Sequence, residues 1–207
     1  MDADLNDKPE KRVLMDRTAN PAPLGLLGFG MTTVMLNLHN ADLIPLGSVI
    51  LSLGIFYGGL AQLLVGLMEW KKGNTFGTAA FTSYGLFWLT LVGIWTLPTL
   101  GLGEPTDKAT MGYFLAIWGV YTLFFFAGTL RSNRATQFIF GSLAVLFFAL
   151  AIGDLTQIKE ITVAAGYIGL VCGASAIYTG SAMVVNEANG KRSEEHTSEL
   201  QSHSGIS

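Results

Sequence analysis

The chain has 207 residues, of which 50% are hydrophobic and only 13% are charged. A soluble domain carries about a quarter charged residues, so this composition excludes an ordinary soluble protein. The net charge of −3 is too small to indicate a nucleic-acid partner. The single cysteine, Cys172, excludes an intrachain disulfide and a thiolate metal cluster.

The charged residues are clumped, and the runs between them are long and apolar. Runs 43–68, 74–103 and 109–130 contain no charged side chain. They match the ~20 residues that a helix needs to cross the hydrocarbon core, and their continuous apolarity argues against a membrane β-barrel. The sequence therefore predicts an all-α membrane protein whose residues 20–190 form a six-transmembrane-helix bundle. Its helices are expected at 22–40, 46–69, 76–97, 111–130, 136–153 and 161–185, the fifth being short because Asp154 follows it.

Lysines and arginines fall mainly on one side of this bundle, which predicts its orientation. Nine of them precede the first helix, follow the last, or lie after the second and fourth helices, whereas two lie in the other connections. Cytoplasmic loops carry the excess of positive charge, so both termini are expected in the cytoplasm. The nine are Lys8, Lys11, Arg12, Arg17, Lys71, Lys72, Arg131, Arg134 and Lys191, and the two are Lys108 and Lys159.

The two ends of the chain are set apart from the bundle. Residues 1–19 form a polar leader, which is expected in the cytoplasm. The stretch RSEEHTSELQSH (192–203) matches the in-frame translation of a common sequencing adapter. We therefore expect residues 191–207 to be a non-native tail and the natural C-terminus to be absent.

Uncharged polar residues lie inside the predicted spans. In lipid, such groups must find partners among themselves, the backbone or water. Two interpretations stay open: hydrogen bonds between helices, or a polar route on which neutral donors replace part of the hydration shell of a small anion without trapping it. These residues are Thr32, Thr33, Asn37, Gln62, Thr82, Ser83 and Tyr84.

The first predicted helix begins with prolines, which suit the first turn of a helix because its N–H groups have no helical partner. Free N–H groups and a partial positive charge at a helix start favour a carboxylate. We therefore predict that this segment shapes the mouth of the route. Its residues are Asn20, Pro21, Pro23, Leu24 and Gly25.

Glycines recur at the spacing that allows close helix packing. Gly54 and Gly58 form one GxxxG pair, and Gly169 and Gly173 form another. Small residues let helix backbones approach closely in lipid. The pattern suits packing inside one protomer and contact between protomers equally well.

The chemistry of a membrane enzyme is missing from the predicted spans. They contain no His-x-x-x-His, no acidic pair at helical spacing and no serine beside an intramembrane base. His39 and Asp154 lie at helix ends, where a capping or loop role is expected. Gly25, Gly28 and Gly30 are in the wrong order for a GxGxxG loop and follow no strand. We expect no enzymatic activity, no metal and no cofactor.

The stretch NPAPLGLLGFGMTTVMLNLHNA, which begins at Asn20, resembles the signature of the acetate uptake transporter family. The resemblance covers 19–190. It implies a six-helix protomer, a homohexamer, and a path through each subunit for acetate and succinate across the bacterial inner membrane. Further similar stretches are GIFYGGLAQLLVG (54–66), EWKKGNTFGTAAFTSYGLFWLT (69–90), WGVYTLFFFAGTL (118–130) and LVCGASAIY (170–178).

The resemblance also implies that Phe29, Tyr84 and Leu143 form a constriction on the path. All three lie on odd-numbered predicted helices: Phe29 is six residues past Pro23, Tyr84 seven past Gly77, and Leu143 seven past Thr136. At ~1.5 Å per residue, all three should lie about 10 Å deep and can form one ring. The expected function is transport of small carboxylates, either as a proton-linked permease or as an anion channel. The alternative is a membrane sensor or assembly protein that keeps the bundle without transporting.

Overall fold

The computed structural model describes residues 18–190, and every regular element in this part of the chain is helical. The predicted leader and the predicted non-native tail lie outside it, apart from residues 18 and 19. The helices are α1 (Ala22–Asn40), α2 (Ser48–Ile55), η1 (Phe56–Ala61), α3 (Gln62–Lys71), α4 (Thr75–Thr96), η2 (Pro98–Leu100), α5 (Lys108–Thr129), α6 (Arg134–Thr156) and α7 (Lys159–Ala188).

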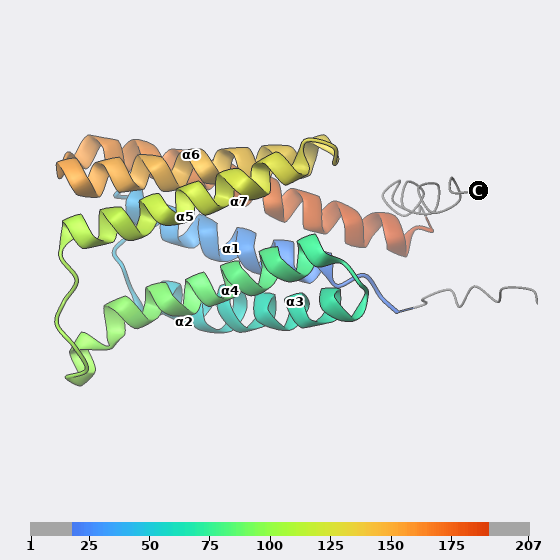
Figure 1. Ribbon diagram of the computed structural model, residues 1–207, viewed down its shortest axis with the longest axis horizontal. Coiled ribbons are helices and arrows are strands. Elements are labelled where there is room, and N and C mark those ends of the chain that lie inside the picture. Colours follow the sequence, from blue (N-terminus) through green and yellow to red (C-terminus); the bar gives the residue numbers. More distant parts are fainter. Residues whose placement is uncertain (1–17, 191–207) are drawn as a thin grey trace, which may run out of the picture.

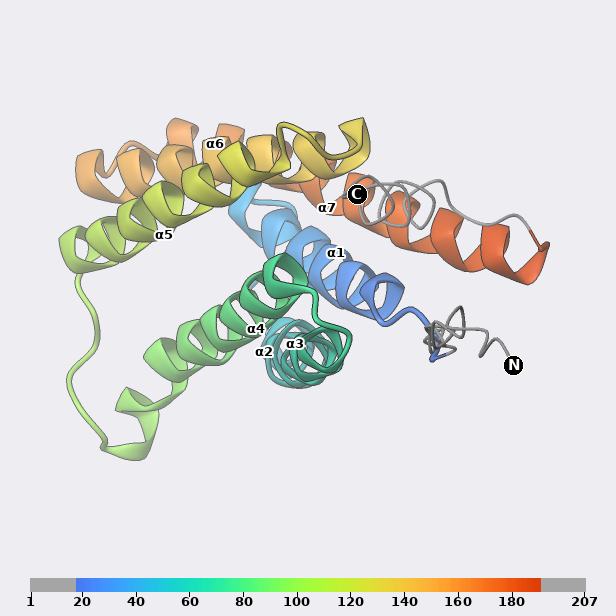
Figure 2. The ribbon, with the colours of Figure 1, turned by 45° about the vertical axis from the view of Figure 1, so that its right-hand side comes forward.

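The helices form two groups with α1 between them (Figures 1 and 2). Helix α1 packs along α7, which contacts α6, and α6 in turn packs along α5. On the other side, α4 packs against α3, and α1 also contacts η1 and α3. The start of α1, the α3–α4 and α5–α6 turns, and the end of α7 all lie on one side in Figure 1. The chain thus crosses back and forth as the sequence predicts.

Five helices in residues 18–190 are long and apolar enough to cross a membrane, which makes this a multi-pass membrane protein. They are α4, α5, α6, α7 and the continuous rod formed by α2, η1 and α3. Helix α1 is not among them. It has 19 residues but carries five polar ones in its second half. Four of the six predicted spans therefore match single apolar helices, and the second matches the continuous rod.

Two predicted spans have different bounds or geometry from those expected. The fifth is not short: α6 has 23 residues and continues past Asp154. The carboxylate of Asp154 is neutralised by Lys108, whose Nζ lies 2.7 Å from Asp154 Oδ1. The second span contains a π-helical turn, η1, which has glycines at 58 and 59. Such single turns are rare inside α-helices and often occur at functional sites.

Asparagine and aspartate side chains fix where three helices begin. Asn74 Oδ1 accepts a hydrogen bond from the N–H of Gly77, Asp107 Oδ1 from Thr110, and Asn133 Oδ1 from Thr136, at 2.8–3.0 Å. These bonds satisfy N–H groups that have no partner inside the helix. The short connections are thereby set by local sequence.

Both glycine pairs pack inside the protomer, which decides between the two interpretations of their spacing. A Cβ on Gly54 would meet Val92, and one on Gly58 would lie 2.9 Å from Thr32 Oγ1. A Cβ on Gly173 would lie 2.8 Å from the carbonyl oxygen of Gly30. Gly169 faces the side chain of Asn37.

Gly169→Ala should lower the thermal midpoint of the protein in detergent by about 5 °C or more, because the added methyl would overlap the Asn37 side chain. Overpacking a tight interior costs about 1–3 kcal/mol, which corresponds to several degrees in a chain of this size. Gly47→Ala is the control, since nothing lies within 4 Å of a Cβ there. Equal midpoints for the two variants would contradict the packing described.

Candidate functional site

The three residues of the predicted constriction are all buried in the interior of the bundle. Phe29 in α1, Tyr84 in α4 and Leu143 in α6 are 6%, 4% and 4% exposed and belong to one buried cluster. The ring centroids of Phe29 and Tyr84 are 6.3 Å apart, with the planes inclined at 56°. Whether the three residues lie at one depth and form a ring stays a prediction.

Tyr84, one residue of the predicted constriction, belongs to an aromatic layer that joins α4 to α5 and α6. Tyr84 contacts Trp118 and Phe140 at centroid distances of 5.9 and 6.0 Å. One turn further along α4, Phe87 contacts Trp118 at 4.9 Å and Phe147 at 5.2 Å. Rings fill the space between these helices, so the interior at this level is closed and apolar.

The backbone of the π-helical turn, η1, packs against the glycines next to Phe29 and Tyr84. A Cβ on Gly28, next to Phe29, would lie 2.6 Å from the carbonyl oxygen of Tyr57. A Cβ on Gly85, next to Tyr84, would lie 2.8 Å from the carbonyl oxygen of Gly59. The residues beside both aromatic rings therefore rest on the backbone of η1.

Four of the predicted polar residues already have partners in the interior. The Thr32 hydroxyl donates to the carbonyl of Gly28 at 2.8 Å, and the Asn37 amide donates to the carbonyl of Thr33 at 2.8 Å. The other two bridge α4 and α5: Tyr84 and Thr122 share a bond of 2.8 Å between their hydroxyls, and Tyr121 donates to Ser83 Oγ at 2.7 Å. The bonds of Tyr84 and Ser83 therefore join two helices, as one of the two interpretations requires, whereas the bonds of Thr32 and Asn37 stay within α1.

Three other predicted polar residues have buried atoms without a hydrogen-bond partner in the described structure. They are Thr33 Oγ1, Gln62 Oε1 and Thr82 Oγ1, and the indole Nε1 of Trp88 joins them. An unpaired buried polar group costs about 1–3 kcal/mol. Such a group calls for an explanation, and a transient ligand is one.

Trp88 was missed by the sequence reasoning. Among apolar residues, tryptophan is expected in the core or at the membrane interface, so its N–H was not counted as an interior donor. No pattern in the sequence distinguishes Trp88 from Trp95, which is also in α4. Its burial, at 3% exposed, and its lack of a partner appear only in the folded protein.

The predicted mouth has a different chemistry from the one expected. Asn20 Oδ1 accepts from the N–H of Ala22 at 3.0 Å, and the N–H groups of Leu24 and Gly25 donate to the carbonyl of Pro21. Pro21 and Pro23 have no N–H. The first turn of α1 therefore has no N–H left for a carboxylate. The prediction that free N–H groups at this helix start would bind a carboxylate is wrong.

The residues of the predicted mouth also differ in exposure. Leu24 is 41% exposed, whereas Pro23 and Gly25 are buried. A Cβ on Gly25 would meet the ring of Phe81, and Pro23 lies against Gly180 in α7. Any contribution of this segment to a path is therefore through its shape.

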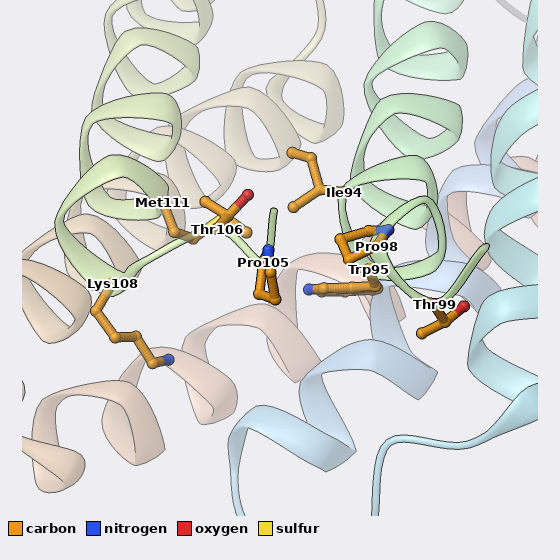
Figure 3. Close-up of a pocket in the computed structure, with 8 residues that line it drawn as sticks. All are labelled: Ile94, Trp95, Pro98, Thr99, Pro105, Thr106, Lys108 and Met111. Atoms are coloured by element: carbon orange, nitrogen blue, oxygen red, sulfur yellow. The ribbon is translucent and has the colours of Figure 1, made fainter. Parts of the chain in front are cut away.

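A cavity of about 300 Å³ lies beside the α4–α5 connection (Figure 3). Trp95 and Pro98 face Pro105 there, and Lys108 lies at its edge (Figure 3). None of the predicted site residues lines it.

Comparison with known proteins decides the family of the chain. The model of the GPR1/FUN34/yaaH family matches residues 3–193. The chain belongs to this family. It is 57% identical over 175 residues to a succinate-acetate/proton symporter, SatP, of Escherichia coli, covering 84% of this chain and 93% of that protein. An uncharacterized protein of Methanothermobacter thermautotrophicus is 51% identical over 193 residues, covering 90% and 95%.

A solved structure described as the bacterial acetate channel SatP has the same fold. It is 56% identical in sequence and superposes with a TM-score of 0.83, covering 84% of this chain and 97% of that one. Both the sequence and the fold therefore place the chain in the GPR1/FUN34/yaaH family, as the resemblance of its motifs predicts.

The two ionisable residues singled out in the sequence, His39 and Asp154, lie near helix ends. His39 Nδ1 is 3.1 Å from the carbonyl oxygen of Ile44, and Asp154 pairs with Lys108. Lys159 Nζ lies 2.6 Å from Asp42 Oδ2 and lowers the pKa of that carboxyl. Within residues 18–190, no group of three His, Cys, Asp or Glu side chains could hold a metal ion.

Proposed function

We propose that this protein transports acetate and succinate across the bacterial inner membrane. The observation that carries the proposal is its 57% identity, over nearly the whole relative, to a succinate-acetate/proton symporter. The similarity in fold to a bacterial acetate channel supports it. The relatives are named for transport, and we infer the same class of activity here rather than an enzymatic one.

In this proposal α1 also crosses the membrane, which brings the number of spans to six, and both termini are cytoplasmic. The polar side chains of Thr32, Thr33 and Asn37 are at most 2% exposed, so they face neighbouring helices rather than lipid. A helix enclosed in this way does not need the apolar surface of a lipid-facing span. The excess of lysine and arginine at the side of the termini supports the orientation.

We infer that the path passes between Phe29, Tyr84 and Leu143. Phe29 and Leu143 close it with apolar surface, and Tyr84 forms its wall while its hydroxyl is held by Thr122. A carboxylate must shed water to pass such a ring, and neutral polar groups beside it compensate part of that loss without holding the anion. The unpaired hydroxyls of Thr33 and Thr82 suit this role, because a hydroxyl can donate a hydrogen bond to a carboxylate.

A homohexamer is the assembly implied by the family resemblance, and we retain it as part of the proposal. Its support in this chain is the apolar outer surface. On α5, Ile117 and Phe124 are 69% and 73% exposed, and on α7, Tyr178 is 77% exposed. Such faces must meet lipid or neighbouring subunits. Cross-linking in membranes would measure the subunit number.

Proteoliposomes containing the full chain should take up labelled acetate faster than empty liposomes. Uptake is measured with and without an inward proton gradient, at a fixed gradient of undissociated acetic acid. Accumulation above equilibrium would indicate symport, and faster equilibration alone would indicate a channel. Uptake equal to that of empty liposomes would reject the proposal and favour a sensor or assembly protein.

A further inference from the structure

Trp88 carries a donor that the fold leaves unused. Its indole side chain is 3% exposed, and Nε1 has no hydrogen-bond partner in the described structure. The three other unpaired atoms belong to hydroxyl and amide groups, which can rotate or exchange roles. An indole N–H can only donate, and its direction is fixed by the ring.

The position of Trp88 is next to the constriction. It lies four residues after Tyr84, one helical turn along α4. Thr32 lies three residues after Phe29 on α1. The two side chains meet at Gly58, where a Cβ would lie 2.9 Å from both Trp88 Cδ1 and Thr32 Oγ1. Trp88 and Thr32 therefore share one level, on the side of the constriction toward the α4–α5 connection.

Gln62 lies one helical turn closer to the level of Tyr84, where the rod of α2, η1 and α3 packs against α4. It follows Gly58 by one turn, and its Cβ is 3.3 Å from the place a Cβ would take on Gly85. Gly85 is next to Tyr84, so Gln62 lies at the level of the constriction itself. Polar atoms without partners thus occupy two successive levels, the constriction and the turn beyond it.

We propose that the Nε1–H of Trp88 donates a hydrogen bond to the carboxylate of the substrate as it leaves or enters the constriction. The inference rests on the proposed transport function and adds a residue to it. A neutral donor held by packing suits a small carboxylate, since it holds the anion more weakly than a lysine or arginine would. Because Thr32 already donates to Gly28, its oxygen supplies no second donor at this level.

The first test compares acetate uptake by the full chain with that of Trp88→Phe and Trp70→Phe. Phenylalanine removes the N–H and keeps an aromatic ring. Trp70 is 71% exposed at the end of α3 and serves as the matched control. We expect Trp88→Phe to raise the acetate concentration for half-maximal uptake about tenfold, the effect of losing a hydrogen bond to a charged group. Trp70→Phe should behave as the parent chain.

The second test is a binding measurement that does not depend on transport. Acetate should raise the thermal midpoint of the detergent-solubilised parent and of Trp70→Phe, and raise it less in Trp88→Phe. In the parent, the indole proton resonance of Trp88 should move downfield when acetate is added. This measurement does not depend on whether the Trp88→Phe variant folds. Its assignment follows by eliminating the signals of Trp70, Trp95 and Trp118.

The outcomes separate the two proposals. No uptake by the parent above empty liposomes would reject transport, and the midpoint and resonance would then decide on Trp88 alone. Equal half-maximal concentrations and midpoint shifts in all three chains, with an unmoved Trp88 resonance, would overturn the role of Trp88. In that case the indole serves packing only.

Discussion

Leu143→Ala is expected to admit acids larger than acetate, such as lactate, through the constriction. Leu143 is 4% exposed and belongs to the same buried cluster as Phe29 and Tyr84. Removing three side-chain carbons there opens space on the path. Discrimination by one missing or added methylene is about tenfold or more. We therefore expect the ratio of lactate to acetate uptake to rise about tenfold.

The substitution also costs stability, which the experiment must separate from selectivity. Leucine to alanine in a buried site destabilises by about 2–5 kcal/mol. Leu143→Val is therefore measured beside it, because it enlarges the path less and costs less. Val145→Ala, on the exposed face of α6, is the control. A lactate-to-acetate ratio that stays the same in both Leu143 variants, at normal expression, would remove Leu143 from the constriction.

Gln62→Leu should slow acetate uptake about tenfold without lowering the thermal midpoint. Gln62 is 2% exposed and its Oε1 has no partner. Replacing an unpaired buried polar group by an apolar one of similar size is neutral or stabilising. In our proposal the amide turns its NH2 toward the passing carboxylate, and losing that hydrogen bond to a charged substrate slows uptake about tenfold. A purely structural residue would not give this combination of slow uptake and preserved stability.

The control for this variant is Ser52→Ala, which removes a hydroxyl from the exposed face of the same rod. Uptake should then equal that of the parent chain. If Gln62→Leu lowers the midpoint and leaves uptake per folded protein intact, Gln62 serves packing and has no role in the path. Binding of acetate, measured by its effect on the midpoint, should weaken in Gln62→Leu alone.

The partners of the interior polar groups could not be assigned from the sequence. Thr32, Asn37 and Gln62 look alike in a hydropathy plot, yet the first two donate to carbonyls of their own helix and Gln62 Oε1 has no partner. A threonine or asparagine can bond to the carbonyl four residues back, which local sequence allows but does not require. Only packing decides which atom is left over.

Trp88 and the π-helical turn illustrate the same limit. A π-helical turn depends on contacts across helices, here between η1 and the glycines at 28 and 85, which are distant in the sequence. The burial of the indole depends on Gly58 lying opposite. Neither contact leaves a local pattern, so a sequence-based prediction of donors omits Trp88.

The sequence by itself determined that the protein is helical and membrane-embedded, where its connections lie, and which family it resembles. These follow from long uncharged apolar runs, from the charged residues between them, and from the NPAPLGL stretch, all of which are local. The tertiary structure decided that Phe29, Tyr84 and Leu143 are buried together, and that the helix start at Pro21 offers no free N–H. The physical reason is that an interior polar group in lipid finds its partner, or is left without one, according to which residues far apart in the chain pack beside it.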